Sequence, residues 1–203
     1  MPLIVPQFRG YLDPIESPFP AAGSYTVDLD IRHRFVDLVG IGGGSGGNGG
    51  DGGAGRAGTG GEAAAWGSLR LTRGVEIPWT ATQVLVTVGV GGARAPKEQQ
   101  GRAGTATVFT IGGVVVLTCP AAPRPSPQYQ GHYDGTAPGD FTYALTGNTF
   151  TGGIAGKGGA RDGNGSHASG LGAGGGAGNG GIYTVAWEGG DGSAGGAWVR
   201  GSQ

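Results

Sequence analysis

The sequence predicts an all-β domain: a small β-sandwich or jelly-roll-like fold with glycine-rich excursions. Apolar and polar residues alternate with a period of two over windows of strand length. No window has a convincing helical period, and the single candidate, "EAAAW" at 62–66, is short. Glycine supplies 50 of the 203 residues and is gathered in blocks between the apolar windows.

A proline-rich arm is expected to precede this domain. Residues 1–22 place prolines between apolar residues, and proline fixes φ and removes a backbone donor, so the arm is extended and not helical. It packs either on its own domain or on a neighbouring subunit. Residues 23–203 then form the glycine-rich β domain, with glycine blocks at 42–61 and 152–196 and an insertion at 120–150.

The apolar windows predict a series of strands. In chain order they lie at 24–30, 34–41, 66–74, 83–92, 105–119, 140–147, 181–187 and 196–201. The fifth window is interpreted as two strands around a turn at Gly112-Gly113. In two windows the apolar residues that are expected to share one face are Val84, Val86, Val88 and Val90, and Phe141, Tyr143 and Leu145.

The glycine block at 42–62 has a regular repeat. From Gly43 to Gly61 every third residue is glycine, a register that a flexible linker does not need. A period of three matches the polyproline II helix, which has three residues per turn and no internal hydrogen bonds. Collagen shares this period but depends on proline and hydroxyproline. Because the block contains no proline, collagen is excluded.

Such helices need neighbours. Glycine permits close backbone approach, and the unpaired N–H and C=O groups can bond between adjacent helices. This packing has to offset an ordering cost of roughly 1–2 kcal/mol per residue. Glycine triplets at 153–159, 172–181 and 189–195 are expected to supply further helices. We therefore predict packed polyproline II helices, with plain solvated loops as the alternative.

Composition argues against several classes of function. The net charge is −1 and the basic residues are scattered, which argues against a nucleic-acid partner. No span approaches the roughly 20 apolar residues of a membrane helix, and prolines interrupt the N-terminus where a signal peptide needs an apolar helix. We therefore expect no membrane insertion, and we expect the protein to be assembled in a cytoplasm. Cys119, the single cysteine, is expected to be buried and inert, and it excludes an internal disulfide.

No motif predicts an enzyme, so no catalytic, cofactor-binding or metal-ligating residue is assigned and no cofactor is expected. A G-x-G-x-x-G match at 42–47 is followed by more glycine, where a dinucleotide site needs a helix. Residues 46–54 match the start of a calcium-binding repeat but carry glycine at its apolar position. His33, His132 and His167 fit no metal-ligand pattern.

Two stretches are candidate contact sites. The proline-rich loop 120–135 is expected to be exposed, and its last five residues, "GHYDG", place polar and aromatic groups together. Trp66 is the second candidate, although a core position is the expected one. Residues 93–104 form another loop, with much of the local charge. Three more residues are interpreted as turn residues: Asp162, Asn164 and Asp191.

Three motifs follow one another in a particular order. They are "LVTVGVGGA" at 85–93, "GTATVFTIGGVVV" at 104–116 and "GGDGSAGGAWVRG" at 189–201, preceded by a strand and the glycine block. This order resembles the glycine-rich domain of bacteriophage tail proteins, and the composition is similar to minor tail proteins of phages that infect actinobacteria. The resemblance covers roughly residues 21–119 and 172–203. The proline arm and the insertion depart from it.

The resemblance implies a structural virion component, a non-enzymatic minor tail protein at the tail tip or fibre. It implies other tail proteins as partners, a homotrimer, and a host-facing surface of bundled glycine-rich helices whose loops contact a host glycan or protein. The resemblance also implies that the protein is located in the virion, in the phage tail. A homo-oligomer is also expected because one chain of this composition buries little apolar area for its length.

Alternatives from other classes stay open. The glycine blocks also look like the repeats of mycobacterial cell-surface proteins, which carry a helical N-terminal module that is missing here. An ice-binding bundle would need a regular threonine or alanine face. A carbohydrate-binding β-sandwich or a glycan hydrolase would want paired carboxylates in a cleft, whereas Asp28, Asp30 and Asp37 are expected mostly to face water.

Overall fold

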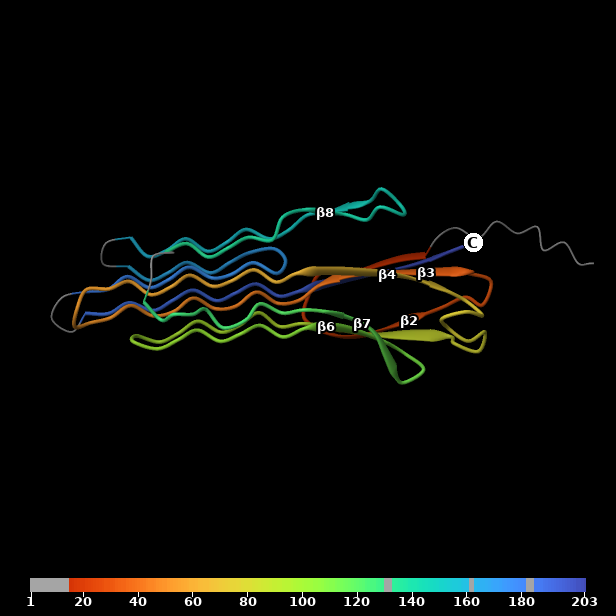
Figure 1. The fold of residues 1–203 in the computed structure, drawn as a ribbon, viewed down its shortest axis with the longest axis horizontal. Coiled ribbons are helices and arrows are strands. Elements are labelled where there is room, and N and C mark those ends of the chain that lie inside the picture. The colour runs from red at the N-terminus through yellow and green to blue at the C-terminus, as the bar shows by residue number, and fades with distance from the viewer. Residues whose placement is uncertain (1–14, 130–132, 161–162, 182–184) are drawn as a thin grey trace, which may run out of the picture.

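The computed structural model describes residues 15–129, 133–160, 163–181 and 185–203, with the side chains of 15–17 left aside. The described chain contains no α-helix or 3₁₀-helix, and the predicted all-β class is confirmed. The molecule has two parts, a β-sandwich and an array of extended segments that run side by side away from one end of it (Figure 1). We call the opposite end of the sandwich, where the C-terminus lies, the base.

Two antiparallel four-stranded sheets form the sandwich, in the orders β1-β10-β3-β4 and β2-β5-β6-β7. A small third sheet pairs β8 with β9. The strands are β1 (Ile15–Phe19), β2 (Gly23–Asp28), β3 (Phe35–Ile41), β4 (Trp66–Thr72), β5 (Gln83–Val88), β6 (Thr107–Ile111), β7 (Val114–Cys119), β8 (Phe141–Thr142), β9 (Thr149–Phe150) and β10 (Gly196–Ser202).

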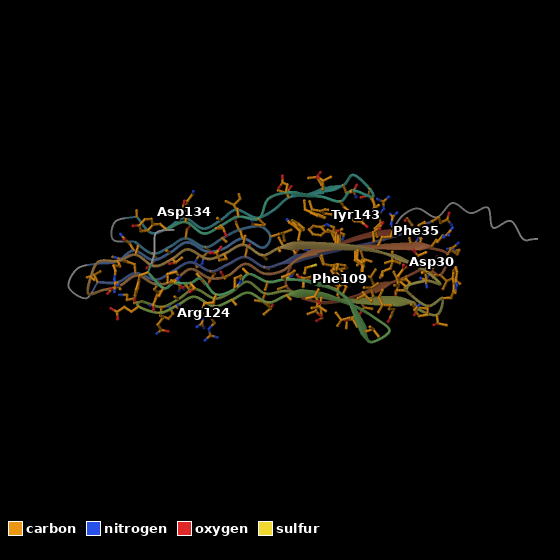
Figure 2. All side chains as sticks on the ribbon, in the orientation of Figure 1. Asp30, Phe35, Phe109, Arg124, Asp134 and Tyr143 are labelled. Carbon is orange, nitrogen blue, oxygen red and sulfur yellow. The ribbon has the colours of Figure 1, made fainter. Side chains whose placement is uncertain are left out.

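The core lies between the two large sheets and follows the alternation in the sequence. In β5 every second residue is buried, and Val84, Val86 and Val88 pack with Phe109 and their neighbours in one apolar cluster. Phe109 lies between the sheets in Figure 2. The predicted position of Val90 is wrong: β5 ends at Val88, and Val90 is 56% exposed in the array.

The first strand was missed by the sequence reasoning. Part of the predicted arm forms β1, which pairs with β10 of its own sheet from Ile15↔Gly201 to Phe19↔Ala197. β1 is an edge strand and contains Pro18, in keeping with the confinement of proline to sheet edges. Residues 1–14 lie outside the described part of the chain.

Three local predictions differ from the structure. The window 140–147 forms only the two-residue strand β8 and a turn, in which Leu145 is 56% exposed. Residues 181 and 185–187 are not in a strand, and the rest of that window lies outside the described residues. "EAAAW" is not helical, because 62–65 are extended and Trp66 begins β4. By contrast, the Gly112-Gly113 turn between β6 and β7 is confirmed, with φ of 58° and 80°.

Outside the strands the chain forms extended segments, which we number PPII-1 to PPII-10, where PPII stands for polyproline II. They are PPII-1 (42–51), PPII-2 (56–65), PPII-3 (89–96), PPII-4 (99–106), PPII-5 (120–125), PPII-6 (135–140), PPII-7 (151–160), PPII-8 (163–168), PPII-9 (173–181) and PPII-10 (185–195). Several continue directly from a strand or lead directly into one. PPII-1, for example, follows β3, and PPII-10 leads into β10.

Backbone hydrogen bonds reveal a threefold rotation along PPII-1. The N–H of Gly43 donates to PPII-4, that of Gly44 to PPII-10 and that of Ser45 to PPII-2. The same three acceptor segments recur in the same order for the next three residues, with N···O distances of 2.9 Å. Three residues per turn with every bond leaving the segment is the geometry of polyproline II. The glycine period in the sequence therefore reports real helical structure.

The carbonyls of PPII-1 complete a hexagonal arrangement. They accept from PPII-3, PPII-5 and PPII-9, so PPII-1 has six hydrogen-bonded neighbours. PPII-9 has six as well: it donates to PPII-6, PPII-1 and PPII-8 and accepts from PPII-2, PPII-7 and PPII-10. The bonds between the remaining segments give three rows in cross-section: PPII-5, -2 and -6; PPII-4, -1, -9 and -7; and PPII-3, -10 and -8. PPII-1 and PPII-9 are the two enclosed segments.

Enclosure explains why these two segments are nearly free of side chains. Residues 42–50 and 172–178 are buried throughout, whereas the outer segments are buried mainly on one face. A Cβ atom at Gly44 would lie 2.0 Å from the carbonyl oxygen of Ala173, and one at Gly46 would lie 2.1 Å from that of Ala93. Only glycine fits positions with a neighbouring backbone so close.

Two parts of the array differ from the sequence reading. The block at 42–62 is not one helix, because it reverses direction at 52–54 and continues as PPII-2, antiparallel to PPII-1. The proline-rich loop, expected to be exposed, instead contributes PPII-5 at 120–125. There the Ala122 N–H donates to the Gly43 carbonyl, and Pro125 is fully buried. Proline suits this role because its fixed φ matches polyproline II.

The buried thiol of Cys119 gives a first testable prediction. Cys119 is 0% exposed and its Sγ lies against β4, and burial raises the pKa of the thiol to about 12. We expect no measurable reaction with a thiol-specific disulfide reagent at pH 8 in the native protein, because almost no thiolate is present and access is blocked. The same reagent should titrate one thiol in urea, and rapid native labelling would contradict the buried position.

Candidate functional site

The distal turns, at the end of the array far from the sandwich, hold a network of polar contacts. There Asp51 forms an ion pair with Arg56 at 2.8 Å, across the turn that joins PPII-1 to PPII-2. The Arg56 guanidinium also lies over the ring of Tyr129, 4.8 Å from its centroid. These contacts join the first distal turn to the bend that follows PPII-5.

A second distal turn is tied to the same network. Glu98, between PPII-3 and PPII-4, has a φ of 58°, the one positive φ recorded for a non-glycine residue in the described chain. Its carboxylate accepts from the Gly52 N–H at 3.2 Å, and its carbonyl accepts from the Gln128 side chain at 2.6 Å. Gln128 also donates to the Tyr129 hydroxyl at 2.9 Å. Three turns distant in sequence therefore form one connected surface.

The charges in this network shift two pKa values. The backbone N–H of Gly53 and then the Arg56 guanidinium lower the pKa of Asp51, so its carboxylate stays ionised in mildly acidic solution. Partial burial, followed by the nearby carboxylates of Asp51 and Glu98, raises the pKa of Tyr129. At neutral pH the distal surface thus carries fixed charges and a neutral phenol. Such a surface can bind a partner.

The residues predicted as contact sites do not come together. Trp66 is partly buried on the outer face of the β1-β10-β3-β4 sheet, where its ring packs against Phe141, Phe150 and Trp198. Of the described residues of the loop 120–135, those of the bend at 126–129 reach the distal network, through Gln128 and Tyr129. Trp66 therefore serves packing, as the core reading expected.

The described part of the "GHYDG" sequence lies along the array. Tyr133 is 55% exposed, and Asp134 forms an ion pair with Lys157 of PPII-7 at 2.9 Å. His132 lies outside the described residues. Figure 2 places Asp134 and Arg124 on opposite faces of the array. The described residues of this stretch thus contribute a surface ion pair with PPII-7.

The expected turn residues act as links between segments. The Asn164 side chain accepts the Glu188 N–H at 2.9 Å, which joins PPII-8 to PPII-10. Asp191 accepts the Arg94 N–H at 2.7 Å and pairs with His167 at 2.9 Å. Asp162 lies outside the described residues.

Asp37 corrects an expectation. It was expected to face water, yet it is only 3% exposed and pairs with Arg70 at 2.6 Å on the neighbouring strand β4. The Tyr143 hydroxyl donates to the same carboxylate at 2.8 Å, from the turn that follows β8. Burial, followed by this bond to Asp37, raises the pKa of Tyr143. Figure 2 shows Tyr143 pointing from the β8–β9 hairpin toward the sheet below it.

The Tyr143 contact gives a second prediction. Tyr143→Phe keeps the ring packed but removes the donor to a buried carboxylate, so the free energy of unfolding should fall by about 1.5–3 kcal/mol. Urea denaturation of both proteins measures this, and Thr142→Val, at an exposed position of the same hairpin, is the matched control. An unchanged denaturation midpoint for Tyr143→Phe would mean that the hairpin is not held to the sheet by this bond.

Titratable groups elsewhere are dispersed. His33 is 1% exposed at the base, far from His167 on the array, and neither of its ring nitrogens has a partner. Within the described ranges, no group of three or more His, Cys, Asp or Glu side chains is placed to hold a metal ion. Among the same residues, none belongs to a helix with the length and apolarity that crossing a bilayer requires.

Comparison with known proteins finds a matching family and two relatives by sequence. A family model described as a glycine-rich domain matches residues 20–202. The Gene 32 protein of Mycobacterium phage D29 is 35% identical over 111 residues, which are 51% of this chain and 49% of the relative. The Gene 32 protein of Mycobacterium phage L5 is 31% identical over 134 residues, 64% of this chain and 60% of the relative. The chain thus spans about half to three-fifths of the length of these relatives. The similarity supports the conclusion that this chain is encoded by a phage.

Proposed function

Because this chain belongs to the glycine-rich domain family and its relatives are mycobacteriophage proteins, we propose that it is a structural component of the virion. Its place is the tail tip or fibre, where it acts as a minor tail protein without enzymatic activity. The observation that carries the proposal is the hexagonal array, in which PPII-1 and PPII-9 are each enclosed by six hydrogen-bonded segments.

Such an array suits a spacer. The enclosed segments PPII-1 and PPII-9 are hydrogen-bonded to their neighbours along most of their length, so the array resists bending without needing an apolar core. Its distal turns present side chains of varied chemistry. Loops on a rigid scaffold are a common place for recognition, and the distal turns are therefore the proposed host-facing surface, for a cell-surface glycan or protein.

The sandwich supplies the opposite end of this arrangement. In the proposal the base faces other tail proteins, and the chain assembles as a homotrimer in the host cytoplasm before it joins the tail. Sedimentation of the purified protein at micromolar concentration tests the oligomer. A folded monomer there would rule out the trimer, while leaving the location in the virion to be tested separately.

Labelling of virions tests the location. Antibodies raised against the purified protein, coupled to gold, should bind intact particles of the encoding phage at the tip or fibre of the tail in electron micrographs. Particles assembled without this gene are the control for antibody specificity. Gold on the capsid or along the tail tube, or particles without the protein, would overturn the proposal.

Competition for adsorption tests the orientation. Purified protein should slow adsorption of the phage to its host cells, and Ala54→Trp, which adds bulk to an exposed distal turn, should abolish this competition. The matched control is Thr87→Trp at an exposed position of β5 on the sandwich, which should compete like the parent. If Thr87→Trp alone lost competition, the host-facing surface would be on the sandwich.

A further inference from the structure

Three large apolar side chains are exposed together at the base. Ile31 is 57% exposed, Val75 77% and Trp79 61%. They belong to the loop between β2 and β3 and to the loop between β4 and β5, and we call them the base patch. The Trp79 indole lies over Gly74, where a Cβ atom would be 2.6 Å from its Nε1 atom. The indole thus rests on the backbone.

Both loops are fixed by one buried arginine. Arg73 is 2% exposed, and its guanidinium donates to the carbonyls of His33 and Asp30 in one loop. In the other loop it donates to the carbonyl of Ala81 at 2.7 Å and that of Trp79 at 3.2 Å. Burial lowers the pKa of this guanidinium, which is a sign of the cost of placing a charge there.

The fixed loops favour the interpretation that the base patch binds a partner. Ile31 lies between two residues whose carbonyls bind Arg73, and the Trp79 carbonyl binds it directly. Because Arg73 already fixes both loops, they lose little conformational freedom when a partner binds. Preorganised apolar side chains around an aromatic residue are also typical of the centre of an interface. The base patch itself contains no charged side chain, so its partner is apolar.

The described chain starts at the same end of the sandwich, at Ile15. Ile15 pairs with Gly201, Gly201 with Val36, and Val36 with Leu71, so these four residues form one row across the sheet. Three strand spacings separate Ile15 from Leu71, about 15 Å. Leu71 lies two residues before Arg73. Six residues of extended chain span roughly 20 Å, enough to bring the segment before Arg9 to the base patch.

We propose that the base patch is the docking site of residues 2–8 of the same chain. Their sequence, "PLIVPQF", is uncharged and apolar with two prolines, and proline-containing extended segments recognise exposed aromatic rings such as Trp79. A tether of this length gives the segment a millimolar effective concentration at the patch, which favours its own chain over a neighbour. This inference does not depend on the proposed function.

Disulfide trapping in the full-length protein tests the contact. The double variant Ile4→Cys/Val75→Cys should form an intramolecular disulfide at least tenfold faster than Ile4→Cys/Asp28→Cys under the same oxidant. Asp28 is exposed at the same end of the sandwich but outside the base patch. Cys119 does not interfere, because burial raises its pKa to about 12. Unreduced electrophoresis separates the crosslinked monomer from a crosslinked dimer.

Each outcome decides the proposal. Fast intramolecular crosslinking supports it. Equal rates for the two variants mean that the segment does not reside on the base patch, and crosslinked dimers mean that it docks on a second copy; either result overturns the proposal. Because a cysteine variant can disturb folding, hydrogen exchange provides an independent measurement. In Ile4→Asp/Phe8→Asp the amides of 74–82 should exchange at least fivefold faster than in the parent, and unchanged exchange also overturns it.

Discussion

Gly47→Ala is expected to prevent stable folding of the array. Its Cβ would lie 2.0 Å from the carbonyl oxygen of Gly176, in the facing segment PPII-9. That peptide group cannot move aside without breaking other bonds, because its carbonyl accepts from Gly190 and its N–H, which is that of Ala177, donates to the Tyr133 carbonyl. We expect the free energy of unfolding to fall by at least about 4 kcal/mol, beyond the usual range for a single substitution.

Gly53→Ala provides the matched control for this test. Gly53 lies six residues further on in the distal turn, and the nearest atom to its added Cβ would be the Asp51 carboxylate oxygen at an ordinary 3.4 Å. Its urea denaturation should stay within about 0.5 kcal/mol of the parent, because the change is local and exposed. If Gly47→Ala and Gly53→Ala unfolded at the same urea concentration, the close packing of PPII-1 against PPII-9 would be wrong.

Arg73→Met is expected to have the second-largest effect. Methionine fills most of the same volume but donates no hydrogen bond, so the buried carbonyl of Ala81 and the neighbouring carbonyls of both base loops lose their partner. The free energy of unfolding should fall by about 3 kcal/mol, from the unsatisfied acceptors less the relief of an expensive buried charge. A lower urea midpoint with an unchanged denaturant slope would measure it.

Arg34→Met is the control on the same loop. Arg34 is exposed, and its guanidinium lies over the Phe35 ring at 5.4 Å from the centroid. An exposed interaction of this kind contributes about 0.5–1 kcal/mol, so this variant should lose far less stability than Arg73→Met. Equal losses would show that Arg73 contributes as a solvated surface cation and not as the buried link between the base loops.

The strands could be predicted because they depend on local patterns. β5 alternates in sequence and in burial, and two consecutive glycines mark the turn before β7. The glycine period likewise reports the threefold helix, since it records which positions face a neighbouring backbone. These features are encoded within a few residues of one another.

Other features depend on contacts that no local pattern records. PPII-5 contains no glycine, so its place in the array follows from bonds to PPII-1 and PPII-4, far away in sequence. Asp37 has the pattern of a water-facing strand residue, but its carboxylate is buried and accepts bonds from Arg70 of β4 and from Tyr143 of the hairpin folded over the sheet. The distal network joins turns around Asp51, Glu98 and Gln128, and a polar turn residue in sequence does not reveal its partners.

The threefold rotation of PPII-1 also governs how such a chain changes length in evolution. An insertion of one or two residues would turn every later N–H toward the wrong neighbour, whereas an insertion of three preserves all the pairings. A triplet lengthens a segment by about 9 Å, so the antiparallel partner in the same hairpin must gain a triplet too. Beyond the last shared bond this restriction ends. The distal turns can therefore gain or lose single residues, while the array changes length only by triplets inserted in both segments of a hairpin.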